Sequence, residues 1–274
     1  MTPPKPRRAA ARVAGVVLAA GQGSRFGGPK ALAELDGERL VDRAARLLRV
    51  GGCDPVVVVL GAAVVDVPGA DAVVVNQDWS TGMGSSLRAV LGDPVLDGCS
   101  AVAVVLVDQP GIRAEAVRRL VAAHLGGAQL AVAVYDEGAG HPVLLGREHW
   151  AGVAELAEGD AGARRYLSAH PDRVVQVDCT GRGDARDADT PDQLTGRGVL
   201  SRIAGGAGAA TGSGLAAGLG ELGALLGGAG ARAAMQEKAA QAVRRQTVQD
   251  GEPPFGVDLA AGVAWLPRTR EEPE

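Results

Sequence analysis

Short runs of β-branched and aliphatic residues, separated by helical patterns, constrain the fold of this chain more than any other feature of its sequence. Each run is four to seven residues long and is bounded by Gly, Asp or Pro, as is typical of buried strands. Between two of the runs, Leu40, Ala44 and Leu48 share one helical face, while the other positions are largely charged. Strands that alternate with helices predict a three-layer α/β/α sandwich around a mostly parallel, Rossmann-like sheet. The expected strands are Val13–Ala19, Val56–Leu60, Ala72–Val75, Ala101–Val107, Gln129–Tyr135, His141–Leu145 and Arg173–Asp178.

The composition supports this fold class. Hydrophobic residues make up 46% of the 274 positions, yet the chain has only three Trp, two Tyr and two Phe. Val, Ala and Leu must therefore build the core, which suits a parallel sheet covered by helices better than an aromatic-rich sandwich. The 41 glycines show no three-residue period, so a collagen-like structure is excluded.

The amino-acid composition changes after Leu194, and we divide the chain into four expected parts. We expect a disordered N-terminal arm at residues 1–12 and a folded domain at residues 13–196. Residues 197–230 are predicted to be a Gly/Ala-rich linker, because the backbone entropy of so many glycines opposes a helix. Residues 231–274 form a C-terminal tail of unknown role, with a helical pattern at 231–249, and a separate partner-binding module there is a further interpretation.

Charge and cysteine usage indicate the compartment and the class of partner. The formal net charge is −4, which is not the basic field of a nucleic-acid-binding protein. Three cysteines without CxxC spacing argue against a disulfide framework and fit a reducing cytosol. Residues 5–8 imitate the start of a signal peptide, but Arg12 interrupts the apolar run that follows. We therefore expect a cytoplasmic protein that binds neither a membrane nor nucleic acid.

A glycine-rich loop after the first expected strand carries the strongest chemical signal. It has four glycines between residues 21 and 28, together with Ser24, Arg25 and Lys30. Glycines let backbone N–H groups converge on phosphate oxygens, while Arg25 and Lys30 neutralise negative charge. The dinucleotide fingerprint fails because Phe26 occupies its third glycine position, and the P-loop fails because Pro29 precedes the lysine. A surface turn with incidental charges is the remaining alternative.

The string LAAGQGSRFGGPK at residues 18–30 resembles the opening motif of the MobA-like NTP transferases, roughly LAAGxSxRxGxxK. Further segments occur in the order of that family and are similar to its molybdenum cofactor cytidylyltransferase branch. The resemblance implies that residues 13–196 are a nucleotidyltransferase domain. The further segments are NQDWSTGMGSSL at 76–87, LVDQP at 106–110, GHPV at 140–143, GDAGAR at 159–164 and DADTPD at 187–192.

The resemblance also implies a Mg²⁺ site. Asp108 follows a fully apolar strand, and ligands in open α/β sheets bind beyond the carboxyl ends of strands. Mg²⁺ prefers one or two carboxylates together with substrate phosphates, and the family assigns Asp108 to it. We expect one of Asp187 and Asp189 to reach the metal, and the motif favours Asp189. The alternative for Asp108 is a helix cap before Pro110.

Three groups of site residues follow from the resemblance. Arg25, Lys30 and Asp108 are expected to be catalytic, and His141 and Gln109 to contact the acceptor. Ser85 has the alternative of capping a helix, and Asp160 is expected to cap a helix of its own segment. The residues expected to bind the nucleotide are Leu18, Ala19, Ala20, Gly21, Gly23, Ser24, Arg25, Lys30, Asn76, Gly82 and Ser85.

The implied reaction is Mg²⁺-dependent transfer of CMP from CTP to molybdopterin cofactor with release of pyrophosphate. An attacking phosphate is already anionic and needs no general base, so catalysis rests on positioning and charge neutralisation. A molybdenum hydroxylase is the expected recipient of the product. Two alternatives stay open: transfer to a sugar phosphate or another small molecule, and a non-catalytic protein that delivers molybdenum cofactor.

Overall fold

The computed structural model describes residues 11–24, 26–188, 194, 257–258 and 263–264. Two predicted site residues, Arg25 and Asp189, lie outside the described residues. The linker expected at 197–230 and the helix expected at 231–249 also lie outside them. Of the predicted N-terminal arm, Arg12 is the first residue of a strand, so the folded domain begins one residue earlier than predicted.

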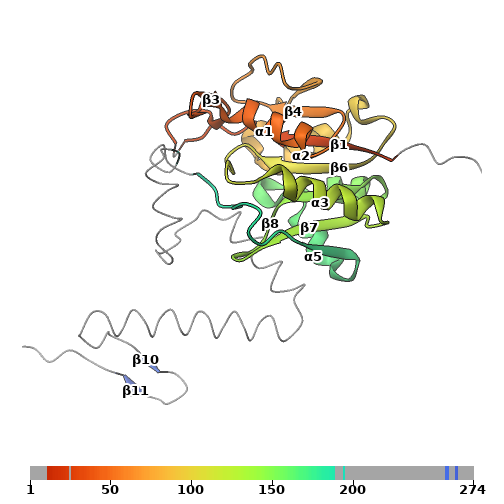
Figure 1. Cartoon of the computed structure of the whole chain (residues 1–274). Coiled ribbons are helices and arrows are strands. Elements are labelled where there is room, and N and C mark those ends of the chain that lie inside the picture. The colour runs from red at the N-terminus through yellow and green to blue at the C-terminus, as the bar shows by residue number, and fades with distance from the viewer. Residues whose placement is uncertain (1–10, 25, 189–193, 195–256, 259–262, 265–274) are drawn as a thin grey trace, which may run out of the picture. The chain divides into compact units, whose positions relative to one another are not determined.

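All seven expected strands are present, and they form one sheet in the order β5-β4-β1-β6-β8-β7-β9 (Figure 1). The pairs β1–β4, β1–β6, β4–β5 and β7–β9 are parallel, whereas β8 is antiparallel to β6 and β7. The strand that starts furthest from its prediction is β8, because its hairpin with β7 extends pairing to Gly138. The bounds are β1 Arg12–Leu18, β4 Val56–Leu60, β5 Ala72–Val75, β6 Cys99–Leu106, β7 Leu130–Tyr135, β8 Gly138–Gly146 and β9 Val174–Asp178.

Helices cover both faces of the sheet, which confirms the predicted three-layer α/β/α sandwich. Val56 and Val58 of β4 pack in one core with α1 (Leu40–Val50) and α3 (Ala114–Leu125). Val57 and Val59 point to the other core, which α2 (Met83–Leu91), α4 (Trp150–Leu156) and α5 (Arg164–Ala169) close. This two-residue alternation on a strand buried on both faces explains its continuous run of valines.

Among the described residues, none of the helices has the length and hydrophobicity that a membrane span requires.

The remaining elements are short. In the predicted tail, β10 and β11 form an antiparallel pair within a separate unit, residues 227–274. These elements are β2 Glu34–Leu35, β3 Glu38–Arg39, β10 Val257–Asp258, β11 Val263–Ala264 and the 3-10 turns η1 Lys30–Leu32, η2 Trp79–Thr81, η3 Pro94–Leu96, η4 Arg147–His149, η5 Gly159–Ala161 and η6 Pro171–Arg173.

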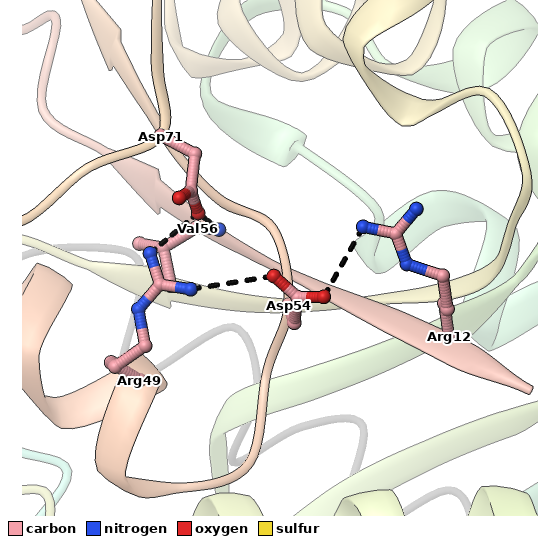
Figure 2. A network of polar contacts seen from close by, with 5 residues as sticks. All are labelled: Arg12, Arg49, Asp54, Val56 and Asp71. Carbon is pink, nitrogen blue, oxygen red and sulfur yellow. Dashed lines mark hydrogen bonds and ion pairs between the residues drawn. The ribbon is translucent and has the colours of Figure 1, made fainter.

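An ion-pair network joins the amino ends of three neighbouring strands (Figure 2). Asp71, which precedes β5, accepts hydrogen bonds from the backbone nitrogen of Val56 at 2.6 Å and from Arg49 Nη2 at 2.5 Å. Asp54 pairs with Arg49 at 3.4 Å and with Arg12 at 3.2 Å. Arg12 is the first residue of β1 and Val56 is the first residue of β4. The network therefore connects the amino ends of these strands, at the edge of the sheet opposite their carboxyl ends.

The Asp71 carboxylate should stabilise the fold in a pH-dependent way. The hydrogen bond from Val56 and then the contacts with Arg49 lower the pKa of Asp71. A folded-state pKa below the unfolded value of about 3.9 gives stability that is full above that pH and lost as the pH falls through the folded pKa. We expect Asp71→Asn, which removes only the charge, to lower the free energy of unfolding at pH 7 by about 0.5–1 kcal/mol, since the group is partly exposed.

Urea denaturation at pH 7 and at about pH 2 measures this effect. The difference between wild type and Asp71→Asn should shrink at the lower pH, because the stabilisation by the wild-type carboxylate is lost as the pH falls toward and through its folded pKa. Asp172→Asn is the control, because Asp172 is exposed and has no recorded ion pair in the described part of the chain. An equal loss of stability for Asp71→Asn at both pH values would contradict the assignment.

Candidate active site

A cavity of about 600 Å³ lies beyond the carboxyl ends of β1 and β6, where ligands bind in open α/β sheets. The loop after β1, the end of β6 and the first turn of α2 line it, and Asp160 and Arg164 contribute to its wall. Most of the residues predicted to bind the nucleotide are therefore brought together. Those that line the cavity are Leu18, Ala19, Ala20, Gly21, Gly23, Ser24, Lys30 and Gly82.

The glycine-rich loop closes on the carbonyl oxygen of Gly23. The backbone nitrogens of Phe26, Gly27 and Gly28 donate to this oxygen at 2.9, 3.0 and 3.2 Å. Gly23 has φ +61°, and a Cβ atom there would lie 2.0 Å from the Gly28 oxygen, so only glycine fits. These three hydrogen bonds stabilise the closed turn of the loop, and Ser24 and Lys30 of this loop line the cavity.

A partly buried ion pair lies at the centre of the site. Lys30 Nζ lies 3.0 Å from Asp108 Oδ2, and their side chains are 13% and 22% exposed. Lys30 begins η1 and Asp108 follows β6 after one residue, so the pair joins the loops after β1 and β6. The helix-cap alternative for Asp108 is wrong, because α3 begins at Ala114 and its N-cap residue is Arg113.

Asp108 fits a divalent cation. Its Oδ1 atom is buried, and among the described residues no donor forms a hydrogen bond with it. Within the same part of the chain, no group of three or more Asp, Glu, His or Cys side chains is arranged to hold a metal ion. A cation bound at Asp108 would need ligands beyond the described carboxylates, and substrate phosphates are ligands that Mg²⁺ prefers. The backbone nitrogen of Ala188 donates to the Asp108 carbonyl oxygen at 2.7 Å, so the chain just before Asp189 lies beside Asp108.

Gln109 lies away from the main cavity. Its Nε2 donates to the Ala185 carbonyl oxygen at 2.8 Å and to Asp187 Oδ1 at 2.9 Å. The side chain lines a different cavity, of about 230 Å³, between α1 and the start of α3. These bonds join Gln109 to the segment before Asp189, and its contact with the acceptor stays a prediction.

Asn76 and Ser85 organise the first turn of α2 from behind the cavity wall. Asn76 Nδ2 donates to Ser85 Oγ at 2.8 Å and to Ser86 Oγ at 3.0 Å, while its Oδ1 accepts from the backbone nitrogen of Asp78 at 2.9 Å. Of these residues only Ser86 lines the cavity. The capping alternative for Ser85 is wrong, because Gly82 is the N-cap residue and both serines lie inside the helix.

Asp160 reaches the cavity through a contact that the sequence did not reveal. Its Oδ1 accepts from the backbone nitrogen of Met83 at 3.3 Å, at the start of α2. The expectation that it caps a helix of its own segment is wrong, since α5 has Ala163 as its N-cap residue and no side-chain cap. A carboxylate at the amino end of a helix is favoured by the exposed N–H groups there, whichever segment supplies it.

His141 of β8 lies in a smaller space beside the main cavity. It lines a small cavity of about 30 Å³ that shares Leu18, Met83, Asp160 and Arg164 with the main one. Its Nδ1 is buried and has no hydrogen-bond partner in the described residues. Burial lowers the pKa of His141 to about 4, so the imidazole is neutral at physiological pH. Its contact with the acceptor stays a prediction.

Comparison with known proteins identifies relatives of the chain. A family model described as MobA-like NTP transferase domain matches residues 15–174. The chain is 40% identical over 195 residues to nicotine blue oxidoreductase of Paenarthrobacter nicotinovorans, covering 66% of this chain and 94% of that protein. It is 36% identical over 105 residues to a probable molybdenum cofactor guanylyltransferase of Opitutus terrae, covering 38% and 52%.

A solved structure shares the fold of most of the chain. It is a homologue, from Mycobacterium sp. strain JC1, of Mycobacterium tuberculosis Rv0371c. The TM-score is 0.58 and the sequence identity is 33%, covering 70% of this chain and 97% of that one. The matched scaffold is therefore shared by proteins whose names give different activities.

The contact between α2 and the segment that carries Asp160 should depend on Gly82. Gly82 has φ +109°, and a Cβ atom there would lie 2.5 Å from the Gly159 carbonyl carbon. We expect Gly82→Ala to lower the free energy of unfolding by roughly 2–3 kcal/mol, because the backbone is strained and the segment must move. Urea denaturation measures the change. Gly69→Ala is the control, since a Cβ atom there meets Ala45 at an ordinary 3.7 Å; equal stability of the two variants would contradict the expectation.

Proposed function

The chain belongs to the MobA-like NTP transferase family, and from this premise we propose that it transfers a nucleotidyl group from an NTP to a phosphorylated acceptor, releasing pyrophosphate. The observation that carries the proposal is the Lys30–Asp108 pair in a cavity at the carboxyl edge of the sheet. A cation that neutralises phosphate and a carboxylate with an unpartnered oxygen are the two charges that a metal-bound triphosphate requires.

In nucleotidyl transfer, the protein contributes mainly by positioning the substrates and neutralising their charge. The phosphate of the acceptor is the nucleophile, and it carries negative charge without the help of a base. In keeping with this, the described lining of the main cavity contains no His or Cys. Lys30 would neutralise charge on the α-phosphate and the departing pyrophosphate, with Arg25 proposed to assist it. Asp108, together with Asp189 as a further proposal, would hold Mg²⁺, which when bound neutralises charge on the triphosphate oxygens.

We further propose that the NTP is CTP and that the acceptor is molybdopterin cofactor. Ala19, Ala20 and Gly21 and the segment at 76–87 support the cytidylyl branch. The relative named a probable molybdenum cofactor guanylyltransferase supports the acceptor and makes GTP the competing nucleotide. In this proposal the enzyme acts in the cytoplasm and supplies a molybdenum hydroxylase. A sugar-phosphate acceptor and a non-catalytic delivery role are the alternatives that the product assay below separates.

A second candidate function is oxidoreduction of a small molecule. The observation that favours it is the 40% identity to the protein named nicotine blue oxidoreductase, over 94% of that protein. The loop after β1 weighs against a standard dinucleotide site, because Phe26 stands at the third glycine position of that fingerprint. We therefore rank nucleotidyl transfer first.

Removing either member of the central pair should abolish most of the activity. We expect Lys30→Ala and Asp108→Ala each to lower the rate of pyrophosphate release by about 10²–10³, because each removes a charge aimed at the reacting phosphates. Pyrophosphate release with the correct acceptor measures the rate, and circular dichroism checks folding. Asp172→Asn, remote from the cavity, should keep the wild-type rate. Near-normal release by either alanine variant would overturn the proposal.

The product identifies the substrates. We expect mass spectrometry, after incubation with all four NTPs, purified molybdopterin cofactor and Mg²⁺, to find a cytidylylated pterin. A guanylylated pterin would show that the substrate is GTP and not CTP. Transfer only to an added sugar phosphate would contradict molybdopterin cofactor as the acceptor. Binding of the cofactor without turnover would favour a delivery protein. Reduction of nicotine blue by a reduced nicotinamide nucleotide, without any nucleotidyl product, would favour the second candidate.

A further inference from the structure

We propose that the nucleobase of the bound NTP stacks on the indole ring of Trp79. The inference rests on the proposed function, since it requires that the main cavity hold an NTP. In the part of the chain that the structure describes, Trp79 is the one aromatic residue lining either the main cavity or a neighbouring cavity of about 490 Å³. A half-exposed indole is a suitable surface for any base, because every base has a π-face.

Trp79 is held in a fixed place over the end of β4. A Cβ atom on Gly61, the residue after β4, would lie 2.5 Å from Trp79 Cβ and 2.7 Å from Cγ, so the Trp79 side chain packs directly on this backbone. The same added atom would lie 2.9 Å from Ala20 Cβ. Ala62 donates its backbone N–H to the Ala20 oxygen at 2.9 Å, which joins the loops after β4 and β1. The base of the Trp79 side chain therefore packs at the junction of these two loops, and Trp79 lines the cavity.

The Lys30–Asp108 pair lies toward a different neighbour of β1. In the sheet, β4 and β6 are the two neighbours of β1 (Figure 1), and Asp108 follows β6. Trp79 packs at the end of β4, whereas the Lys30–Asp108 pair lies toward β6, and Asp160 and Arg164 line the same cavity. An NTP has an uncharged aromatic base at one end and the triphosphate at the other. With the base on the indole, the triphosphate can extend toward the Lys30–Asp108 pair.

Trp79 also differs from a tryptophan that only fills the core. Trp150 is 7% exposed, and its Nε1 donates to the Leu145 carbonyl oxygen at 2.9 Å. Trp79 is half-buried and faces two cavities, and its Nε1 has no recorded acceptor among the described residues. Stacking tolerates any base, so Trp79 supplies affinity for the nucleoside end of the ligand, while the choice between CTP and GTP depends on other residues.

Calorimetric titration of the full chain with CTP, GTP and inorganic tripolyphosphate, each with Mg²⁺, tests the inference. Wild type should bind all three. Trp79→Ala should weaken binding of both nucleotides about tenfold or more and leave the Kd of tripolyphosphate unchanged, because tripolyphosphate has no base to stack. Trp79→Phe, the matched control, should keep most of the affinity for the nucleotides. Nucleotides, but not tripolyphosphate, should also quench the tryptophan fluorescence of the wild type.

Two results would overturn the inference while the proposed function stands: unchanged nucleotide affinity in Trp79→Ala, or an equal loss of tripolyphosphate and nucleotide binding in that variant. The fluorescence measurement uses the wild-type chain, so it decides the question even where Trp79→Ala does not fold; there, nucleotide binding without quenching contradicts stacking. A wild-type protein that binds neither tripolyphosphate nor any NTP would overturn the proposed function itself, and this inference with it.

Discussion

The ion pair between Lys30 and Asp108 joins the two loops that form the centre of the cavity. Both side chains are mostly buried, and a buried charge is costly unless an opposite charge compensates it. Because β1 and β6 are parallel neighbours, their carboxyl ends meet at one edge of the sheet and bring the two charges to 3.0 Å. The pair places a cationic and an acidic side chain in contact at the cavity, and the second carboxylate oxygen of Asp108 has no donor among the described residues.

The order of the strands then gives each part of the cavity a different chemical character. The loops after β1 and β6 carry Lys30 and Asp108, while Trp79 packs over the end of β4. On the far side of β6, β8 places the neutral His141 in a small cavity that adjoins the main cavity. The parallel strands form the edge of the sheet at which the cavity lies. Single residues on the loops give the parts of the cavity their different chemical characters. Relatives on this scaffold have names of different activities, so function has to be argued from these residues.

Local features of the sequence predicted the fold well. Valine runs bounded by Gly, Asp or Pro located all seven strands of the sheet, because burial on both faces imposes a pattern that a short window reveals. The glycine loop and Asp108 stand out in the sequence for a similar reason, since each follows a strand closely, and Lys30 comes at the end of that loop. Arg25 and Asp189 lie outside the described residues and stay predictions.

The contacts that the sequence did not predict join segments that are far apart in the chain. Asp160 meets the backbone of Met83 across 77 positions, and Gln109 turns toward Ala185 instead of the cavity. The packing of Trp79 on Gly61 depends on how two loops meet in space. No local pattern encodes such contacts, because they arise only when the helices and loops pack on the sheet.

The fate of an isotopic label in the NTP tests most directly whether this cavity transfers a nucleotidyl group. With an NTP labelled at the α-phosphorus, a phosphorylated acceptor and Mg²⁺, the label should appear in the acceptor product, in equal amount to the pyrophosphate released. Release of the label as free nucleoside monophosphate, formation of orthophosphate in place of pyrophosphate, or recovery of intact NTP with every acceptor offered would contradict nucleotidyl transfer.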